Sequence, residues 1–372
     1  RTKRSTFDIS PKVPTMLLPT INFTLPHELE ATAPIEARGL PRDAVRLLVS
    51  HYNNDAVEHT QFFNLTDHLD EGDVVIINTS ATLPAAVRGL HRSGESGREA
   101  EVELHFSTRL SDNLHVVELR TVTPNGTKPF YYADAGDQVQ LPANAALDLI
   151  EPYQGKVQRG GRVRLWLACL DSAETFQTWL NRVGFPIRYS YVPEQWSLES
   201  YQTVFANEPG SAEMPSAGRA FSPLLITQLV AKGVQFAPIV LHTGVASLED
   251  HEPPYAEYFR VSAHSAQTIN RAIAAGRRIV AIGTTAVRAV ESVVDENGRV
   301  MAGEGWTERL ISAENPPQVV NGLLTGFHEP EATHLAMLTA ISGEQHIRHT
   351  YTAALNERYL WHEFGDLHLI LP

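Results

Sequence analysis

An apolar run that ends in a Gly-Thr-Thr segment is the first feature of this sequence that could support chemistry. Gly283, Thr284 and Thr285 open a predicted helix, whose first turn offers free N–H groups and a positive dipole end to a ligand. Either threonine could cap the helix or hold a ligand carboxylate or hydroxyl. Arg288 and Glu291 lie three residues apart and share one helical face. The alternative, an ordinary cap with a surface ion pair, stays open.

Two histidines follow apolar segments and could transfer protons. His242 ends a predicted strand, and His328 lies in a turn beside a glutamate. Imidazole titrates near neutral pH, which suits a general acid or base, and a hydrogen-bonded structural histidine is an equally common alternative.

A loop of small residues precedes one of the predicted helices. Small residues let a ligand approach the backbone closely, although a plain surface connection explains the pattern equally well. The loop consists of Pro215, Ser216, Ala217 and Gly218.

Metal-binding and phosphate-binding motifs are absent from the sequence. No HExxH motif occurs, and His328 and His334 are not one helical turn apart. His346 and His349 lie three residues apart, which a solvated helix face explains. The single cysteine, Cys169, excludes a thiolate zinc site. We therefore expect no metal, and the absence of GxGxxG, GxxxxGK[ST] and GxSxG patterns argues against dinucleotide, P-loop and serine-hydrolase functions.

Composition excludes a further class of protein. The 372 residues include 30 basic and 43 acidic side chains, so the formal charge is −13 and the pI is about 5.6. Non-specific nucleic-acid binders usually have a pI above about 9. Residues 189–372 carry 11 basic and 20 acidic residues, which is −9 of the total charge. Short apolar runs and the lone cysteine predict a soluble, cytoplasmic protein without a membrane span.

Hydrophobic patterning predicts a mixed α/β fold with a β-rich insertion. Residues 1–20 are predicted to be a loose extension. Between residues 85 and 189, short segments alternate apolar and polar residues, which predicts a β-barrel or sandwich. Residues 21–84 and 190–372 alternate strands and helices, which predicts a sheet covered by helices. The helices are expected over residues 222–231, 263–275 and 286–294, and the strands over residues 45–49, 74–78, 234–241 and 277–282.

The order and spacing of these motifs resemble the S-adenosylmethionine:tRNA ribosyltransferase-isomerase family of queuosine biosynthesis. The resemblance spans about residues 23–371, and its main segments are 72–79, 201–206, 215–218, 241–244, 283–288, 324–330 and 364–366. It implies an α/β barrel-like domain interrupted by a β-barrel. It also implies an enzyme that takes S-adenosylmethionine as co-substrate and tRNA as partner. Such enzymes transfer the ribosyl group to 7-aminomethyl-7-deazaguanine and isomerise it to epoxyqueuosine, with release of adenine and methionine.

The resemblance also implies roles for individual residues. A base must remove a proton beside the sulfonium, and a donor must assist adenine loss. The catalytic candidates are His242, Glu291 and His328. The cofactor-binding candidates are Pro215, Ser216, Ala217, Gly218, Thr243, Gly244, Gly283, Thr284, Thr285 and Arg288. The acceptor-binding candidates are Asn78, Thr79, Tyr201 and Gln202.

Several positions depart from the family pattern. Arg219 and Ala220 stand where the family has Leu-His, and Ser200 stands where it has Arg. Two alternatives therefore stay open. One is a paralogue that uses S-adenosylmethionine on a small molecule or another non-tRNA acceptor, and the other is a non-catalytic ligand-binding member of the fold. The sequence also leaves the general base and the oligomeric state open.

Overall fold

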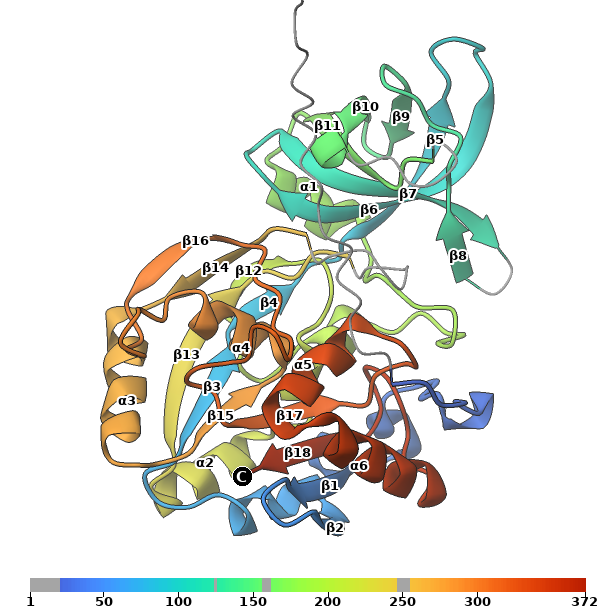
Figure 1. Cartoon of the computed structure of the whole chain (residues 1–372). Coiled ribbons are helices and arrows are strands. Elements are labelled where there is room, and N and C mark those ends of the chain that lie inside the picture. Colours follow the sequence, from blue (N-terminus) through green and yellow to red (C-terminus); the bar gives the residue numbers. More distant parts are fainter. Residues whose placement is uncertain (1–20, 124–125, 156–161, 246–254) are drawn as a thin grey trace, which may run out of the picture.

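The structure, a computed structural model, describes residues 21–123, 126–155, 162–245 and 255–372 (Figure 1). The predicted extension over residues 1–20 lies outside the described residues. Within them the chain forms a seven-stranded sheet, a nine-stranded sheet and a short two-stranded pair. No helix among the described residues is long and apolar enough to cross a membrane.

The seven-stranded sheet closes into the barrel that the alternating pattern predicts. Its strands are β5 (Ala86–Arg92), β6 (Glu99–Arg109), β7 (Leu114–Thr123), β8 (Gly126–Pro129), β9 (Gln138–Leu141), β10 (Ala145–Pro152) and β11 (Leu165–Asp171). The order is β11-β10-β9-β5-β6-β7-β8, and β11 also pairs with β7, so six strands form a closed ring and β8 extends from its rim. Ala145, Leu147 and Leu149 alternate inward along β10. Helix α1 (Phe176–Val183) packs Trp179 into this core against Phe106.

The nine-stranded sheet carries the remaining long strands. They are β1 (Arg46–His51), β2 (Ala56–Gln61), β3 (Val74–Asn78), β13 (Gln235–Leu241), β14 (Glu257–Val261), β15 (Ile279–Ile282), β16 (Gly303–Thr307), β17 (Gly322–Gly326) and β18 (Leu367–Leu371). Their order is β16-β14-β13-β3-β15-β17-β18-β1-β2. The central strands β13, β3, β15 and β17 are parallel. Every residue of β3 and β15 is buried, as expected for parallel strands that are covered on both faces.

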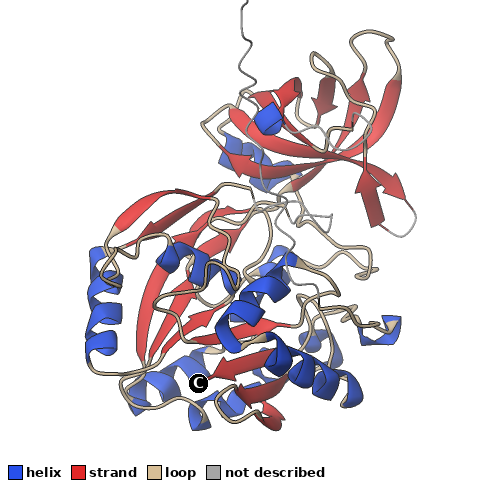
Figure 2. Cartoon of the chain, in the orientation of Figure 1, coloured by secondary structure: helices blue, strands red, loops and turns tan. Residues whose placement is uncertain are grey.

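Helices cover both faces of this sheet (Figure 2). They are α2 (Pro223–Lys232), α3 (Ala263–Ala274), α4 (Thr284–Glu291), α5 (Thr333–Ser342) and α6 (Glu344–Asn356). Side chains alternate along β3, so Val74 and Ile76 join the core under α3 to α6, while Val75 and Ile77 join the core under α2. Short 3-10 turns are η1 (His27–Leu29), η2 (Ile35–Arg38), η3 (Arg42–Ala44), η4 (Phe62–Asp67), η5 (Tyr153–Gly155), η6 (Leu198–Tyr201) and η7 (Ser216–Gly218).

The mixed α/β class and the inserted barrel are confirmed. The larger sheet is open, because β16 and β2 are its two ends and do not pair with each other in the described part of the chain. It is therefore not barrel-like as the resemblance implied. The predicted cap of α2 is confirmed, since Ser222 Oγ accepts the Leu225 N–H at 3.2 Å and Gly233 ends the helix in the left-handed region.

Candidate active site

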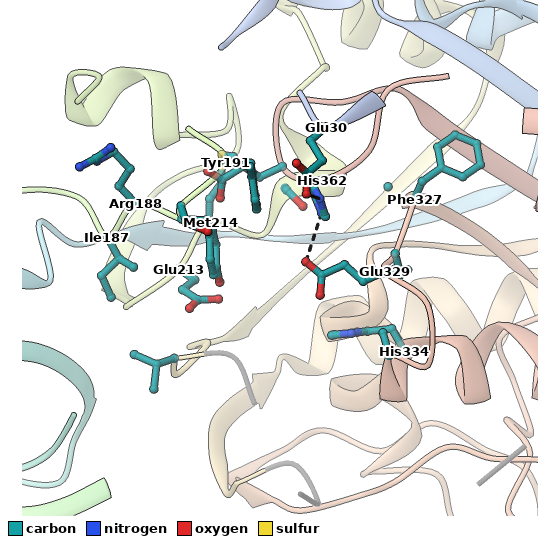
Figure 3. A pocket seen from close by; sticks show the side chains of 18 of the residues that line it. Glu30, Ile187, Arg188, Tyr191, Glu213, Met214, Phe327, Glu329, His334 and His362 are labelled. Atoms are coloured by element: carbon teal, nitrogen blue, oxygen red, sulfur yellow. Dashed lines mark ion pairs between the residues drawn. The ribbon is translucent and has the colours of Figure 1, made fainter. Parts of the chain in front are cut away.

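A cavity of about 440 Å³ lies between the barrel and the loop that follows the central strand β17 of the nine-stranded sheet (Figure 3). Its walls come from segments far apart in the chain. The barrel supplies β7 and its neighbours, and the connection after α1 supplies residues 187–191. The part of the chain that carries the large sheet supplies residues 213, 214, 216, 326–334 and 362–363. A position between two sheets that each have their own apolar core is typical of enzyme sites.

The charged groups that line this cavity are mostly acidic. They include six glutamates but only two arginines, Arg120 and Arg188. The glutamates are Glu30, Glu118, Glu213, Glu329, Glu331 and Glu363. Glu118 is neutralised by Arg120 and by the buried Arg164 of the barrel. The rest of the acidic charge favours a ligand that carries a positive charge.

Flat rings form part of the cavity wall. Tyr189 and Tyr191 are stacked with centroids 5.5 Å apart, and Tyr191 stacks on His362 at 4.1 Å. On the opposite side, His328 stacks on His334 at 4.5 Å with an angle of 5° between the rings. Parallel ring faces of this kind can hold a planar base.

His328 is the predicted catalytic histidine that lines the cavity. Its Nε2 lies 2.9 Å from Thr325 Oγ1, and its backbone N–H donates to the Tyr351 hydroxyl at 3.2 Å. Burial, reinforced by the neighbouring His334 and His362, holds the pKa of His328 well below its usual value. The ring is therefore neutral at pH 7.

Glu363 and Glu213 form an acidic pair at the back of the cavity. Burial, together with the charge of Glu213, raises the pKa of Glu363 to about 8 against the opposing effect of Arg219. The Tyr189 hydroxyl bonds Glu213. Beside this pair, His362 lies 3.6 Å from Glu30 and 3.6 Å from Glu329.

His242 lies outside this cavity lining. Its Nδ1 is 2.8 Å from Ser80 Oγ, and its Nε2 is 4.0 Å from a Glu208 oxygen. Burial lowers the pKa of His242. In the next two residues, Thr243 Oγ1 donates to the Glu213 carbonyl, and Gly244 approaches the barrel, since a Cβ there would lie 2.8 Å from Ser107 Oγ.

Glu291 contacts backbone N–H groups and does not line the cavity. The carboxylate is fully buried and accepts the backbone N–H groups of Gln318, Val319 and Val320 at 2.9, 2.9 and 3.0 Å. Both oxygens therefore accept hydrogen bonds from the chain between β16 and β17.

Arg288 also differs from the predicted surface pair with Glu291. Its guanidinium bonds Glu257 of β14 and donates to the carbonyls of Arg309 and Thr307. Its charge contributes to lowering the pKa of His334 to about 4, after the larger effect of burial. Arg288 therefore lies behind the cavity wall and supports it.

The Gly-Thr-Thr corner is a structural junction. Gly283 is the helix N-cap with φ 86°, and neither threonine side chain caps the helix. The Asn78 side-chain amide donates to the Leu241 carbonyl at 2.8 Å and to Thr285 Oγ1 at 3.3 Å, which ties β3, β13 and α4 together. Thr284 is half-buried in the same turn, and Thr79 Oγ1 donates to the Ile239 carbonyl.

The small-residue loop reaches the cavity through one side chain. Ser216 lines it, and Pro215 precedes η7. Ala217 and Gly218 are buried, and Ala217 Cβ lies 3.3 Å from where a Cβ on Gly283 would stand. Glycine at position 283 therefore has two reasons: it allows the backbone to approach Ala217 closely, and it adopts the positive φ without strain.

The predicted acceptor residues Tyr201 and Gln202, at the end of η6, both contact other parts of the protein. Gln202 makes two side-chain bonds to the backbone of Thr82, at 3.0 and 2.8 Å. Tyr201 is 2% exposed and packs on Phe364. Nearby, Arg219, which departs from the family pattern, is buried and donates to both oxygens of Glu36.

Several cavity residues were missed by sequence reasoning. Glu363 and His362 directly precede the segment 364–366, and Tyr189 and Tyr191 lie where the chain returns from the barrel. The sequence offered two signals for them: residues 362 and 363 adjoin a motif of the resemblance, and residues 189 and 191 lie at the predicted domain boundary. His346, predicted on a solvated face, is 3% exposed and bonds Asp55 and Ser50. Among the described residues, no cluster of three His, Cys, Asp or Glu side chains is arranged to hold a metal ion.

Comparisons with known proteins point to one family. The model of the family described as "Queuosine biosynthesis protein" matches residues 18–370. Proteins named S-adenosylmethionine:tRNA ribosyltransferase-isomerase are similar over 96% of this chain and 100% of their own length. The one from Desulfitobacterium hafniense is 33% identical, and the one from Symbiobacterium thermophilum is 35% identical. The crystal structure of S-adenosylmethionine tRNA ribosyltransferase from Thermotoga maritima is 26% identical with a TM-score of 0.51, and the match covers 94% of this chain and 99% of that one.

Proposed function

Because the chain belongs to the queuosine biosynthesis protein family, we propose that it is an S-adenosylmethionine:tRNA ribosyltransferase-isomerase, the activity that its relatives are named for. The reaction would transfer the ribosyl group of S-adenosylmethionine to 7-aminomethyl-7-deazaguanine in tRNA and isomerise it to epoxyqueuosine. The observation that carries the proposal is the acidic, ring-walled cavity between the two sheets. Its charge suits a sulfonium cation, and its flat walls suit a purine.

S-adenosylmethionine supplies a sulfonium that acidifies the neighbouring 5′ carbon, and adenine loss then exposes an electrophilic carbon. In our proposal the carboxylates of Glu213 and Glu329 face the sulfonium. The rings of Tyr191 and His362 face the adenine, and Ser216 bonds a polar group of the co-substrate. These side chains all line the cavity.

His328 is the base in this scheme. In the tautomer whose Nε2–H donates to Thr325, Nδ1 is an unprotonated acceptor. The depressed pKa of His328 keeps that acceptor free at neutral pH. Of the three catalytic candidates, His242 and Glu291 are assigned to structural support, because neither lines the cavity.

The other predicted binding residues form the support of the cavity in our proposal. Arg288 supports the cavity wall through its bond to Glu257. Thr285 supports the start of α4 through its bond to Asn78. The proposed supporting set also includes Pro215, Ala217, Gly218, Thr243, Gly244, Gly283, Thr284, Thr79, Tyr201 and Gln202.

The tRNA base would enter from the barrel side, where both cavity arginines lie. We take residues 85–189 as a separate inserted domain and residues 21–84 with 190–372 as the catalytic domain. Each has its own apolar core, which supports this division. A tRNA-modifying enzyme of this kind would work in the cytoplasm.

The decisive experiment follows adenine and methionine after the pure protein is mixed with S-adenosylmethionine. One sample contains tRNA with the deazaguanine base, the second contains tRNA with ordinary guanine, and the third contains no tRNA. We expect release only in the first sample, together with an epoxyqueuosine nucleoside in the digested tRNA. Equal release in all three samples would show that the acceptor is water or a small molecule and not tRNA. No release and no binding by calorimetry would refute the proposal.

A further inference from the structure

Glu363 is a cavity carboxyl group with an unusual lack of partners. Its Oε1 is buried and has no hydrogen-bond partner among the described residues. The side chain borders both the main cavity and a small adjoining void between η7 and the residues before β18. A buried carboxyl oxygen without a donor is costly as an anion, so the neutral acid is the favoured form.

The surroundings of Glu363 favour the same form. The charge of Glu213, the other member of the acidic pair, adds to the effect of burial on the pKa of Glu363. The pKa values of Tyr189, Tyr191 and Tyr201 are raised mainly by burial and further by Glu363, which places these three rings near it. The preceding residue, His362, directs its ring toward other carboxylates, those of Glu30 and Glu329.

The nearest cation does not neutralise Glu363 directly. Arg219 is the positive group that faces it, but its guanidinium donates to both oxygens of Glu36, at 3.0 and 2.9 Å, and its Nε donates to the Ser200 carbonyl at 2.9 Å. These bonds engage Nε and one terminal nitrogen of the guanidinium with groups other than Glu363. The carboxyl group therefore keeps a proton that it can give to a ligand.

We propose that Glu363 is the general acid that protonates adenine as it leaves, paired with His328 as the base on the opposite wall. In this step the C1′–N9 bond breaks and its electron pair goes to the adenine ring. The ring oxygen of the ribose supplies the electrons that C1′ loses, and the Glu363 proton goes to an adenine nitrogen. The proton that His328 took from the 5′ carbon returns to Glu363 through water, which restores both groups. The inference rests on the proposed function.

The test compares Glu363→Gln and Glu363→Asp with the wild-type enzyme in single-turnover adenine release. Glutamine keeps the shape but cannot give up a proton, so release should slow by about 100-fold or more. Affinity for S-adenosylmethionine in calorimetry should stay within about threefold, because the neutral forms are nearly isosteric. Glu363→Asp should retain part of the rate. Glu344→Gln, on the exposed start of α6, is the matched control.

The pH profile separates an acid from a structural residue. Wild-type kcat/KM should be constant up to about pH 7 and fall as the pH passes about 8, where Glu363 loses its proton. That limb should persist in Glu363→Asp and vanish in Glu363→Gln. A Glu363→Gln enzyme with the wild-type rate, or with the same alkaline limb, would overturn the acid role and leave the proposed function intact. A wild-type enzyme that releases no adenine would overturn both.

Discussion

Replacing Glu291 by alanine should loosen the chain between β16 and β17 and leave the chemistry of the folded enzyme almost unchanged. The carboxylate accepts three backbone N–H groups in a fully buried position. Two of the donors, Val319 and Val320, are themselves buried, and the third, Gln318, is exposed. The substitution strands the two buried donors, whereas water can hydrate the exposed one.

The size of the effect follows from these contacts. A buried donor left without a partner costs about 1–3 kcal/mol, so Glu291→Ala should lower the free energy of unfolding by about 4 kcal/mol. Glu291→Gln keeps the Oε1 acceptor for Val319 and Val320. It places an amide N–H₂ opposite the Gln318 N–H, so its cost should be only about 1–2 kcal/mol.

Urea denaturation and hydrogen–deuterium exchange measure the two parts of this prediction. Residues 318–320 should exchange faster in both variants, with the larger change in Glu291→Ala. Glu314→Gln, an exposed glutamate in the same connection, should match the wild type. Adenine release per folded molecule should stay within about threefold. Normal exchange combined with a 100-fold loss of adenine release would show that Glu291 acts in catalysis and refute the structural role.

Three further changes test other parts of the structure. A Cβ at Gly210 would lie 2.4 Å from the ring of His242, so Gly210→Ala should cost about 2 kcal/mol in urea denaturation; unchanged stability would contradict this packing. Ser50→Ala leaves two buried histidines without their shared hydroxyl and should lower the free energy of unfolding in urea by about 1–3 kcal/mol; an unchanged value would contradict the bonds to both rings. The pKa of Glu363 is raised from 4.5 to about 8, so the folded state holds a proton that the unfolded chain releases. Stability should therefore fall by roughly 2–4 kcal/mol between pH 5 and 8, and Glu363→Gln should remove that fall.

Local signals in the sequence were sufficient for elements with clear ends or clear alternation. Ser222 and Gly233 marked the ends of α2, and the five apolar and polar residues of 74–78 marked β3 with the observed bounds. Helix α4 begins two residues earlier than predicted, because Gly283 rather than a threonine is its cap. The strand order of the large sheet joins β18 to both β1 and β17, and such long-range pairing leaves no local trace.

In the candidate site, too, local motifs predicted some residues, while residues that depend on long-range contacts were not predicted. His328 and Ser216 were predicted from motifs and line the cavity. Glu291 fitted a catalytic pattern equally well, but its carboxylate accepts N–H groups 27 to 29 residues away in the chain, which no local pattern shows. Glu363 was not predicted, because its burial depends on Glu213 and on rings from other segments.

Part of the acidic charge of the chain lies in the wall of the cavity. Four of the cavity glutamates, at positions 213, 329, 331 and 363, belong to the C-terminal half that carries −9 of the net charge. An acidic cavity repels the phosphates of tRNA and attracts both a sulfonium and the aminomethyl group of a deazaguanine. In the proposed reaction only the modified base would therefore enter, while the backbone stays at the barrel side near Arg120 and Arg188. Arg188→Ala should then weaken tRNA binding and reduce its salt dependence without changing affinity for S-adenosylmethionine. Equal loss of both affinities would place the arginine in the co-substrate site instead.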